Sequence, residues 1–225
     1  GECPAPGAGA AGHLCDARWP MPARPSSGRA GHGRWRCRTG PPGGRVAGAA
    51  RIAPLIYLLG PDVSALVQAC RKQTRMTHRD EAVVDSAEFF ARVVVDVLAG
   101  KRPVMAMQDA AGESYAALAA AQWVQTGLDA ADRDSVEAIQ ELGKTCHAPH
   151  AFPGTVQLIA RHEDDLPQAL IQCVMAGGDS AARGMLVGMV LGAYQGLEAI
   201  PQRWMQELKA GKEIELYLDE LDNVR

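Results

Sequence analysis

Apolar residues recur at helical spacing along almost the whole chain from Val46 onwards. The first clear example is an i, i+3, i+4, i+7 stripe, the pattern of a helix with one buried face, at Val63, Leu66, Val67 and Cys70. No alternating run has the length and β-branched character that a strand requires. The pattern therefore predicts an all-α fold.

Capping residues and glycine–proline pairs divide this pattern into separate helices. A helix is expected to begin after Asp80 and to end at Gly100, which Pro103 follows. Asp165 and Pro167 mark another helix start, because proline within the first turn loses no helical hydrogen bond. Further helices are expected at residues 103–111, 113–126, 132–142, 153–162, 165–177 and 180–196, with a last one after Pro201.

Four glycines lie four residues apart in the helix expected at 180–196, so they share one face of it. A glycine inside a helix costs about 1 kcal/mol relative to alanine, so the stripe predicts a neighbouring helix in close contact. A membrane dimer motif is the alternative, but the apolar run between Arg183 and Gln195 is only eleven residues long. A membrane-spanning helix needs roughly 18, so we expect no membrane segment.

The composition changes sharply near residue 45. Residues 1–50 contain 11 Gly and 7 Pro, with seven Arg, no Lys and two acidic residues. Such a segment buries too little apolar surface to offset the entropy of ordering it. We therefore expect a disordered head at 1–45 and one helical domain at 46–225. The chain starts at Gly1 without a signal-peptide pattern, so the head is interpreted as a truncated start or as sequence from outside the parent reading frame.

The charge balance points to no polyanionic partner. The chain has 23 Lys and Arg against 26 Asp and Glu, a net charge of −3. A nucleic-acid arm around Trp35 is a weaker alternative, so we expect no nucleic-acid partner and no membrane partner. The six cysteines show no CxxC spacing, which disfavours a structural zinc site. A reducing, cytoplasmic location is the resulting expectation.

Gly177, Gly178 and Asp179 immediately precede the glycine-striped helix. One interpretation is an N-cap, in which the Asp179 carboxylate accepts hydrogen bonds from the first helical amides. The other is a magnesium ligand, since hard cations take carboxylate oxygens. Arg183, one turn later, is expected to meet an anionic ligand or to pair with Asp179.

This region resembles the carboxy-terminal motif of the ADP-ribosylglycohydrolase family, particularly its J-crystallin and selenoprotein J-like branch. The resemblance rests on the run from Gly177 to Gly196 and on the residues that follow it as far as Trp204. It covers about residues 46–221. Further stretches similar to landmarks of that branch occur in the same order, namely AARIAPL at 49–55, QTRMTH at 73–78 with Asp80, and GKTCH at 143–147 before FPG at 152–154.

The resemblance implies an all-α fold that binds two magnesium ions in a cleft and hydrolyses the glycosidic bond between ADP-ribose and its acceptor. The expected partner is an ADP-ribosyl small molecule or an ADP-ribosylated protein. Typical members carry Gly-Gly-Asp-Thr-Asp-Thr, whereas Ala181 and Ala182 stand here at the last two positions. Only Asp179 carries over as a metal ligand. The family's acidic amino-terminal half has no recognisable counterpart in residues 1–45, so the helical bundle is expected to be incomplete.

The candidate substrate-binding residues are His78, Cys146, Gly178, Ser180 and Arg183. For His78 a polar turn at a helix start remains an alternative. The adjacency of Cys146 to a histidine does not favour a cysteine hydrolase, because neighbouring side chains rarely reach one substrate atom. Two functions stay open: a magnesium-dependent hydrolase, and a non-catalytic crystallin-like structural or nucleotide-sugar-binding protein, which the two alanines favour.

Overall fold

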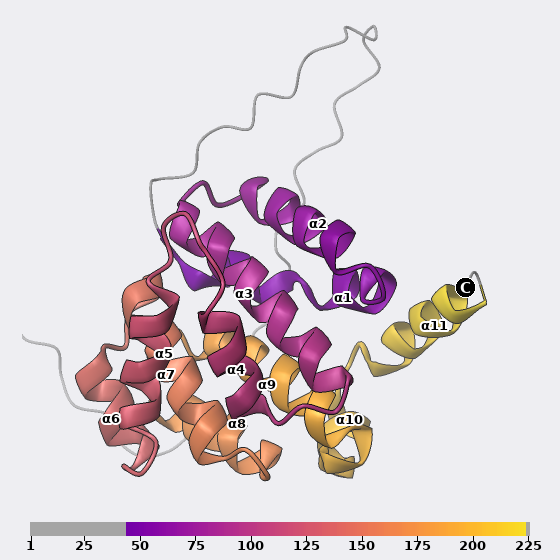
Figure 1. The fold of residues 1–225 in the computed structure, drawn as a ribbon. Coiled ribbons are helices and arrows are strands. Elements are labelled where there is room, and N and C mark those ends of the chain that lie inside the picture. The colour runs from indigo at the N-terminus through magenta and orange to yellow at the C-terminus, as the bar shows by residue number, and fades with distance from the viewer. Residues whose placement is uncertain (1–43, 224–225) are drawn as a thin grey trace, which may run out of the picture. The chain divides into compact units, whose positions relative to one another are not determined.

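The structure, a computed structural model, describes residues 44–223 and contains helices but no strand within them, which confirms the all-α prediction (Figure 1). The predicted head lies almost wholly outside the described residues. In chain order the helices are the 3₁₀ helix η1 (Val46–Arg51), α1 (Ala53–Leu59), α2 (Val63–Arg75), α3 (Glu81–Leu98), α4 (Pro103–Ala111), α5 (Ala120–Asp129), α6 (Ser135–Leu142), α7 (Ala148–Arg161), α8 (Leu166–Met175), α9 (Ser180–Gln195), the 3₁₀ helix η2 (Leu197–Ala199), α10 (Gln202–Glu207) and α11 (Gly211–Asp222).

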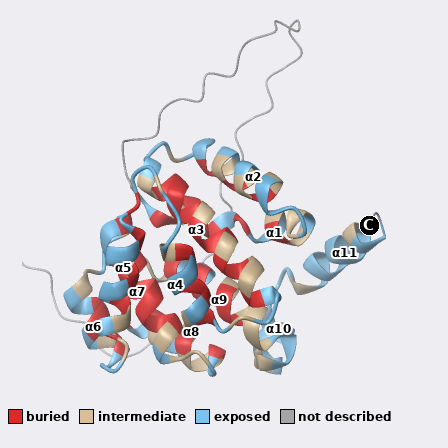
Figure 2. Ribbon diagram, in the orientation of Figure 1, coloured by how far each residue is buried: buried red, intermediate tan, exposed pale blue. Residues whose placement is uncertain are grey.

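The hydrophobic core lies where α3, α7 and α9 pack together (Figure 2). Three buried aromatic rings join α3 to α7: the ring centroids of Phe89 and Phe90 lie 4.9 and 5.2 Å from that of Phe152. Large aromatic side chains contribute strongly to core stability because each buries a wide apolar area. This contact places the carboxy-terminal helices against α3, whose start carries one part of the candidate site.

Local capping signals in the sequence correctly mark the helix starts. Asp62 accepts a hydrogen bond from the Ala65 amide at 2.9 Å, and Asp165 accepts one from the Gln168 amide at 3.0 Å. Asp80 accepts hydrogen bonds from the first amides of α3. Each cap involves residues two or three positions apart, so it depends on neighbouring sequence alone.

The glycine stripe of α9 does not have the predicted role. A Cβ atom built on Gly184 or Gly188 would lie 3.8 Å from its nearest neighbour, an ordinary contact distance, and one on Gly192 would meet nothing within 4 Å. The prediction that these glycines admit a closely packed helix is therefore wrong. The close approach occurs instead at Gly127 of α5, where a Cβ would lie 2.6 Å from the Pro153 carbonyl oxygen of α7.

Three predicted helix boundaries also differ from the structure. The helix expected at 113–126 begins only at Ala120, and the one expected at 153–162 begins five residues earlier, at Ala148. The single last helix is divided into α10 and α11. The late start of α5 has a tertiary cause, because a side chain from α3 binds the backbone amides of the preceding loop.

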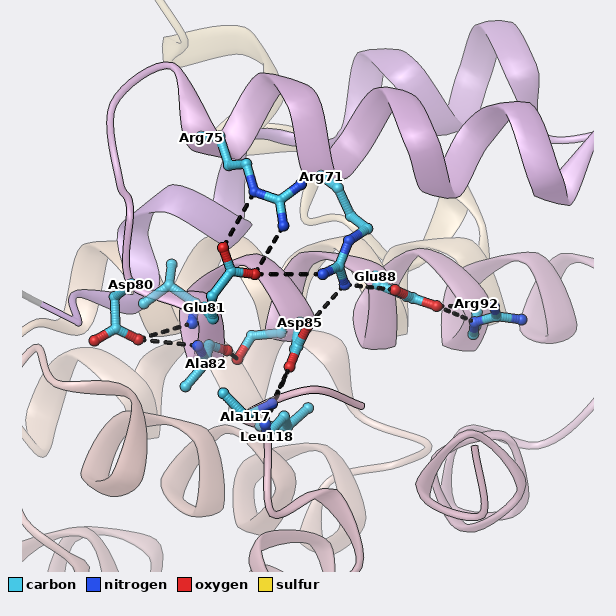
Figure 3. A network of polar contacts seen from close by, with 12 residues as sticks. Arg71, Arg75, Asp80, Glu81, Ala82, Asp85, Glu88, Arg92, Ala117 and Leu118 are labelled. Atoms are coloured by element: carbon cyan, nitrogen blue, oxygen red, sulfur yellow. Dashed lines mark hydrogen bonds and ion pairs between the residues drawn. The ribbon is translucent and has the colours of Figure 1, made fainter. Parts of the chain in front are cut away.

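That side chain is Asp85, which is completely buried on α3 (Figure 3). Its Oδ2 atom accepts hydrogen bonds from the amides of Ala117 and Leu118 at 2.6 and 3.1 Å. Its Oδ1 atom lies 2.7 Å from a guanidinium nitrogen of Arg71 on α2, which also contacts Glu88. A buried carboxylate needs such compensation, so this network fixes α2, α3 and the 113–119 loop together.

Among residues 44–223 no helix is long and apolar enough to cross a membrane. The cysteines within this range, Cys70, Cys146 and Cys173, are free. Cys70 and Cys173 are buried, and burial raises the pKa of both thiols.

Asp85→Ala is expected to lower the free energy of unfolding by about 3 kcal/mol, because it leaves buried amides and a guanidinium without their acceptor. Urea denaturation measures this loss. Glu207→Gln is the matched control, since Glu207 pairs with Arg203 on the surface, outside the Asp85 network, and such exposed pairs contribute only about 0.5 kcal/mol. An equal loss in the two variants would contradict the role assigned to Asp85.

Candidate functional site

The turn before α9 presents the Asp179 carboxylate. Gly177 and Gly178 adopt left-handed φ values of 70° and 67°, which glycine reaches without strain. Asp179 is half-buried, and its Oδ1 atom accepts a hydrogen bond from the Ala182 amide at 3.3 Å. The capping interpretation of Asp179 is thus confirmed. The cap also orients the carboxylate at the positive end of the α9 dipole.

This turn packs against the segment that precedes α7. The Asp179 amide donates a hydrogen bond to the Lys144 carbonyl oxygen at 3.2 Å. A Cβ atom on Gly178 would lie only 2.1 Å from the same oxygen, so no other residue fits there without moving the backbone. Gly178, a candidate substrate-binding residue, therefore has a clear structural role in this packing.

The same segment pairs with the start of the described chain. The Val46 amide donates to the Cys146 carbonyl oxygen at 2.9 Å, and the Ala148 amide donates to the Gly44 carbonyl oxygen at 2.7 Å. These two bonds form an isolated antiparallel bridge. Cys146 is half-buried beside it. The bridge connects the Asp179 turn, through residues 144–148, to η1.

His78 lies next to η1, in the turn between α2 and α3. A Cβ atom on Gly48 would lie 2.7 Å from the His78 ring, so η1 and the imidazole are in direct contact. The His78 Nδ1 atom lies 2.9 Å from the Thr77 hydroxyl, which also accepts a hydrogen bond from Arg51. The helix cap at this point is Asp80, not His78. The His78 side chain is half-buried, and it does not cap the helix.

Two arginines lie near His78 and give this surface a positive charge. Burial lowers the pKa of His78 below its ordinary value, and the charges of Arg51 and Arg45 lower it further. Both arginines are exposed, and neither belongs to any ion pair that joins described residues. We call Arg45, Arg51 and His78 the basic strip. The Asp80 carboxylate lies near the strip, against Gly44, but it forms no ion pair with either arginine within residues 44–223, so the strip suits an anionic ligand.

Arg183 does not lie at the surface, where it could contact a ligand directly. The side chain is completely buried, and its Nη2 atom donates a hydrogen bond to the Gly177 carbonyl oxygen. It makes no ion pair with Asp179 in the described part of the chain. Arg183 is therefore buried next to the turn, in contact with its backbone.

Ser180, the first residue of α9, is half-buried, and its carbonyl accepts a hydrogen bond from Cys173.

The described residues do not fit a two-ion magnesium centre. Within residues 44–223 no group of three or more His, Cys, Asp or Glu side chains is placed to bind a metal ion. Ala181 and Ala182 bring no side-chain oxygen to the turn. Asp179 alone supplies a carboxylate there, which is one ligand of the several that a magnesium ion requires.

Sequence reasoning missed the arginines of the basic strip. Arg51 belongs to the AARIAPL run, but nothing in that run shows that its side chain reaches Thr77. Arg45 lies at the edge of the glycine-rich head. The bridge to residues 146–148 positions it, and a contact between segments 100 residues apart leaves no local signal.

Comparisons with known proteins support the expected relationship. The model of the family described as ADP-ribosylglycohydrolase matches residues 5–225. Crystallin J1A of Tripedalia cystophora is 23% identical over 175 residues, covering 78% of this chain and 53% of the relative. ADP-ribosylhydrolase ARH3 of Homo sapiens is 26% identical over 107 residues, covering 43% of this chain and 30% of the relative.

A solved structure described as an ADP-ribosylglycohydrolase-related protein complex shares the fold, with a TM-score of 0.56 and 23% identity over 79% of this chain and 59% of that chain. The chain spans about half the length of the crystallin relatives that it matches. The predicted resemblance and the predicted fold are both confirmed. The family match extends over almost the entire sequence, and the chain belongs to the ADP-ribosylglycohydrolase family.

Proposed function

We propose that this protein recognises ADP-ribosyl groups, on a small molecule or on a protein, at the surface between the basic strip and the Asp179 turn. The observation that carries the proposal is the charge of Arg45 and Arg51 beside His78, which no residue within 44–223 balances through an ion pair. The diphosphate of ADP-ribose is dianionic, and guanidinium groups bind phosphate oxygens through paired hydrogen bonds. Family membership supports a hydrolase-like function, and the bond to be cleaved is the glycosidic bond of the bound group.

Each part of the surface has a separate task in this proposal. The two arginines of the basic strip bind the diphosphate, and the half-buried His78 places its imidazole ring beside them. Ser180 and Cys146 lie on the segments that pack around the turn and are proposed to contact the sugar. Asp179 presents an acceptor whose direction the helix cap fixes.

In this proposal Asp179 is the only residue within 44–223 that would bind magnesium. A bound ion would supply a cationic centre that polarises substrate oxygens. Residues 44–223 provide too few ligands for the two ions of the family, so we derive no catalytic step through them. Hydrolysis would require further carboxylates from outside these residues.

A second candidate function is a non-catalytic one, as a crystallin-like structural protein or a nucleotide-sugar-binding protein. The observation that favours it is the pair Ala181 and Ala182, which removes two metal-binding side chains from the turn. Release of ADP-ribose from an ADP-ribosylated peptide in the presence of magnesium would favour the hydrolase. Binding of ADP-ribose without release would favour the second function. For either one we propose a cytoplasmic location, which the free cysteines support.

Arg51→Met is expected to weaken ADP-ribose binding about tenfold, because it removes a charge-assisted hydrogen bond to the diphosphate. Isothermal titration calorimetry with ADP-ribose measures the change. The control is Arg133→Met, since Arg133 is an exposed arginine that pairs with Glu141 on α6, away from the strip. Equal affinities of wild type and Arg51→Met would refute diphosphate binding at the strip.

The pKa of His78 is expected to rise when ADP-ribose binds. In the free protein burial and the two arginines keep this pKa below 6.5, and a dianion beside the ring favours its protonated form. The folded pKa lies below the unfolded one, so the free energy of unfolding decreases as the pH falls through about 6.5. Proton NMR titration of the ring, with and without ADP-ribose, measures the shift. A pKa that stays the same on binding would exclude a phosphate next to His78.

Asp179→Asn is expected to abolish any effect of magnesium on ADP-ribose affinity, because the amide is a poor ligand for a hard cation. Titration calorimetry with and without magnesium chloride tests this. Asp165→Asn is the matched control, since Asp165 caps α8 just as Asp179 caps α9. Both variants should lose a similar cap energy of about 1 kcal/mol or less. An identical magnesium response in the two variants would leave Asp179 with a capping role alone.

A further inference from the structure

Arg183 is the largest side chain that is fully buried in the described part of the protein. It lies on α9, one turn after Asp179. Its Cδ atom would be 3.6 Å from a Cβ atom built on Gly154 of α7, and its guanidinium also contacts the Cys173 thiol of α8. The positive charge is therefore surrounded by three helices.

This charge lacks an anionic partner within residues 44–223. Arg183 belongs to none of the ion pairs found there, and its Nε and Nη1 atoms are buried without a hydrogen-bond acceptor. The Cys173 thiol offers no counter-charge, because burial raises its pKa despite the opposing effect of Arg183. An unpaired buried cation destabilises a fold, and an apolar side chain of similar volume is often as stable or more so. Stability alone therefore does not explain an arginine at this position.

Within residues 44–223 the Arg183 guanidinium donates its hydrogen bond to the turn before α9. Its Nη2 atom donates to the carbonyl oxygen of Gly177, the first residue of the turn that presents Asp179. Two consecutive glycines form this turn, and glycine has the widest conformational freedom of any residue. The Lys144 carbonyl anchors the far end of the turn at the Asp179 amide. Arg183 anchors the near end, which no other described side chain contacts through a hydrogen bond.

We propose that Arg183 is a positioning residue: by binding the Gly177 carbonyl from below, it fixes the two-glycine turn and so sets the direction of the Asp179 carboxylate toward the ligand. The inference rests on the proposed ADP-ribosyl binding. It differs from direct substrate contact, because the guanidinium is enclosed and acts through the backbone. Burial of the cation lowers the stability of the fold, and the ordered turn is the functional gain.

The test uses the full chain and three variants. Arg183→Met removes the donor and keeps an unbranched side chain, whereas Arg183→Lys keeps a charged donor. Arg161→Met is the matched control, because Arg161 also donates to a backbone carbonyl, that of Ala131, but away from the turn. Thermal unfolding, hydrogen exchange of the amides at 177–180 and titration with ADP-ribose are measured for each.

For Arg183→Met we expect an unchanged or higher Tm, amide exchange at 177–180 at least about tenfold faster, and ADP-ribose affinity about tenfold weaker. Arg183→Lys should restore exchange and affinity to within about threefold of wild type, and Arg161→Met should change neither. Loss of folding in Arg183→Met, or unchanged exchange at the turn, would overturn the inference. If wild type does not bind ADP-ribose, the proposed function fails, while the exchange measurement still decides whether Arg183 orders the turn.

Discussion

The candidate site depends on one antiparallel bridge, in which the backbone at Gly44 and Val46 pairs with the backbone at Cys146 and Ala148. The bridge joins segments about 100 residues apart in the sequence. On one side of it η1 packs against His78, and on the other side residues 144–146 pack against the Asp179 turn. η1 also packs against α9, the helix that Asp179 caps, so this packing and the two hydrogen bonds together connect the basic strip to the carboxylate.

Some charged side chains within residues 44–223 pair with an opposite charge, and others do not. The Asp85 network on α2 and α3 contains carboxylates and arginines in close pairs, which is the usual arrangement for buried ionic groups (Figure 3). Arg45, Arg51 and Arg183, by contrast, have no carboxylate partner in the described range. Departures from local charge balance are typical of functional sites rather than of structural ones. The turn before α9 carries Ala181 and Ala182, so Asp179 is the only carboxylate that residues 177–182 supply.

The arginines and the alanines of the turn favour different ones of the two proposed functions. The arginines favour recognition of an anionic group, whereas the alanines of the turn remove ligands that a two-ion centre needs. The match to Crystallin J1A covers more of the chain than the match to the human ADP-ribosylhydrolase does. Both facts favour the proposed binding of an ADP-ribosyl group over the proposed hydrolysis.

The sequence by itself determined the helical class, the family and the capped starts of helices. The caps at Asp62, Asp165 and Asp179 were predictable because each one joins atoms only three residues apart. The family resemblance identified His78, Cys146 and Asp179 as candidate site residues. No local pattern could show that a bridge between distant segments connects the parts of the chain that carry them.

Only the tertiary structure decided which side chains are enclosed and which face one another. Arg183 was expected to meet an anionic ligand or to pair with Asp179, whereas the structure buries it and its guanidinium donates to the Gly177 carbonyl oxygen. The glycines of α9 suggested close packing that Gly127 provides elsewhere. Asp85 delays the start of α5 by binding loop amides more than 30 residues away. Burial and long-range hydrogen bonds depend on segments that the fold brings together, and a linear pattern records only the neighbours along the chain.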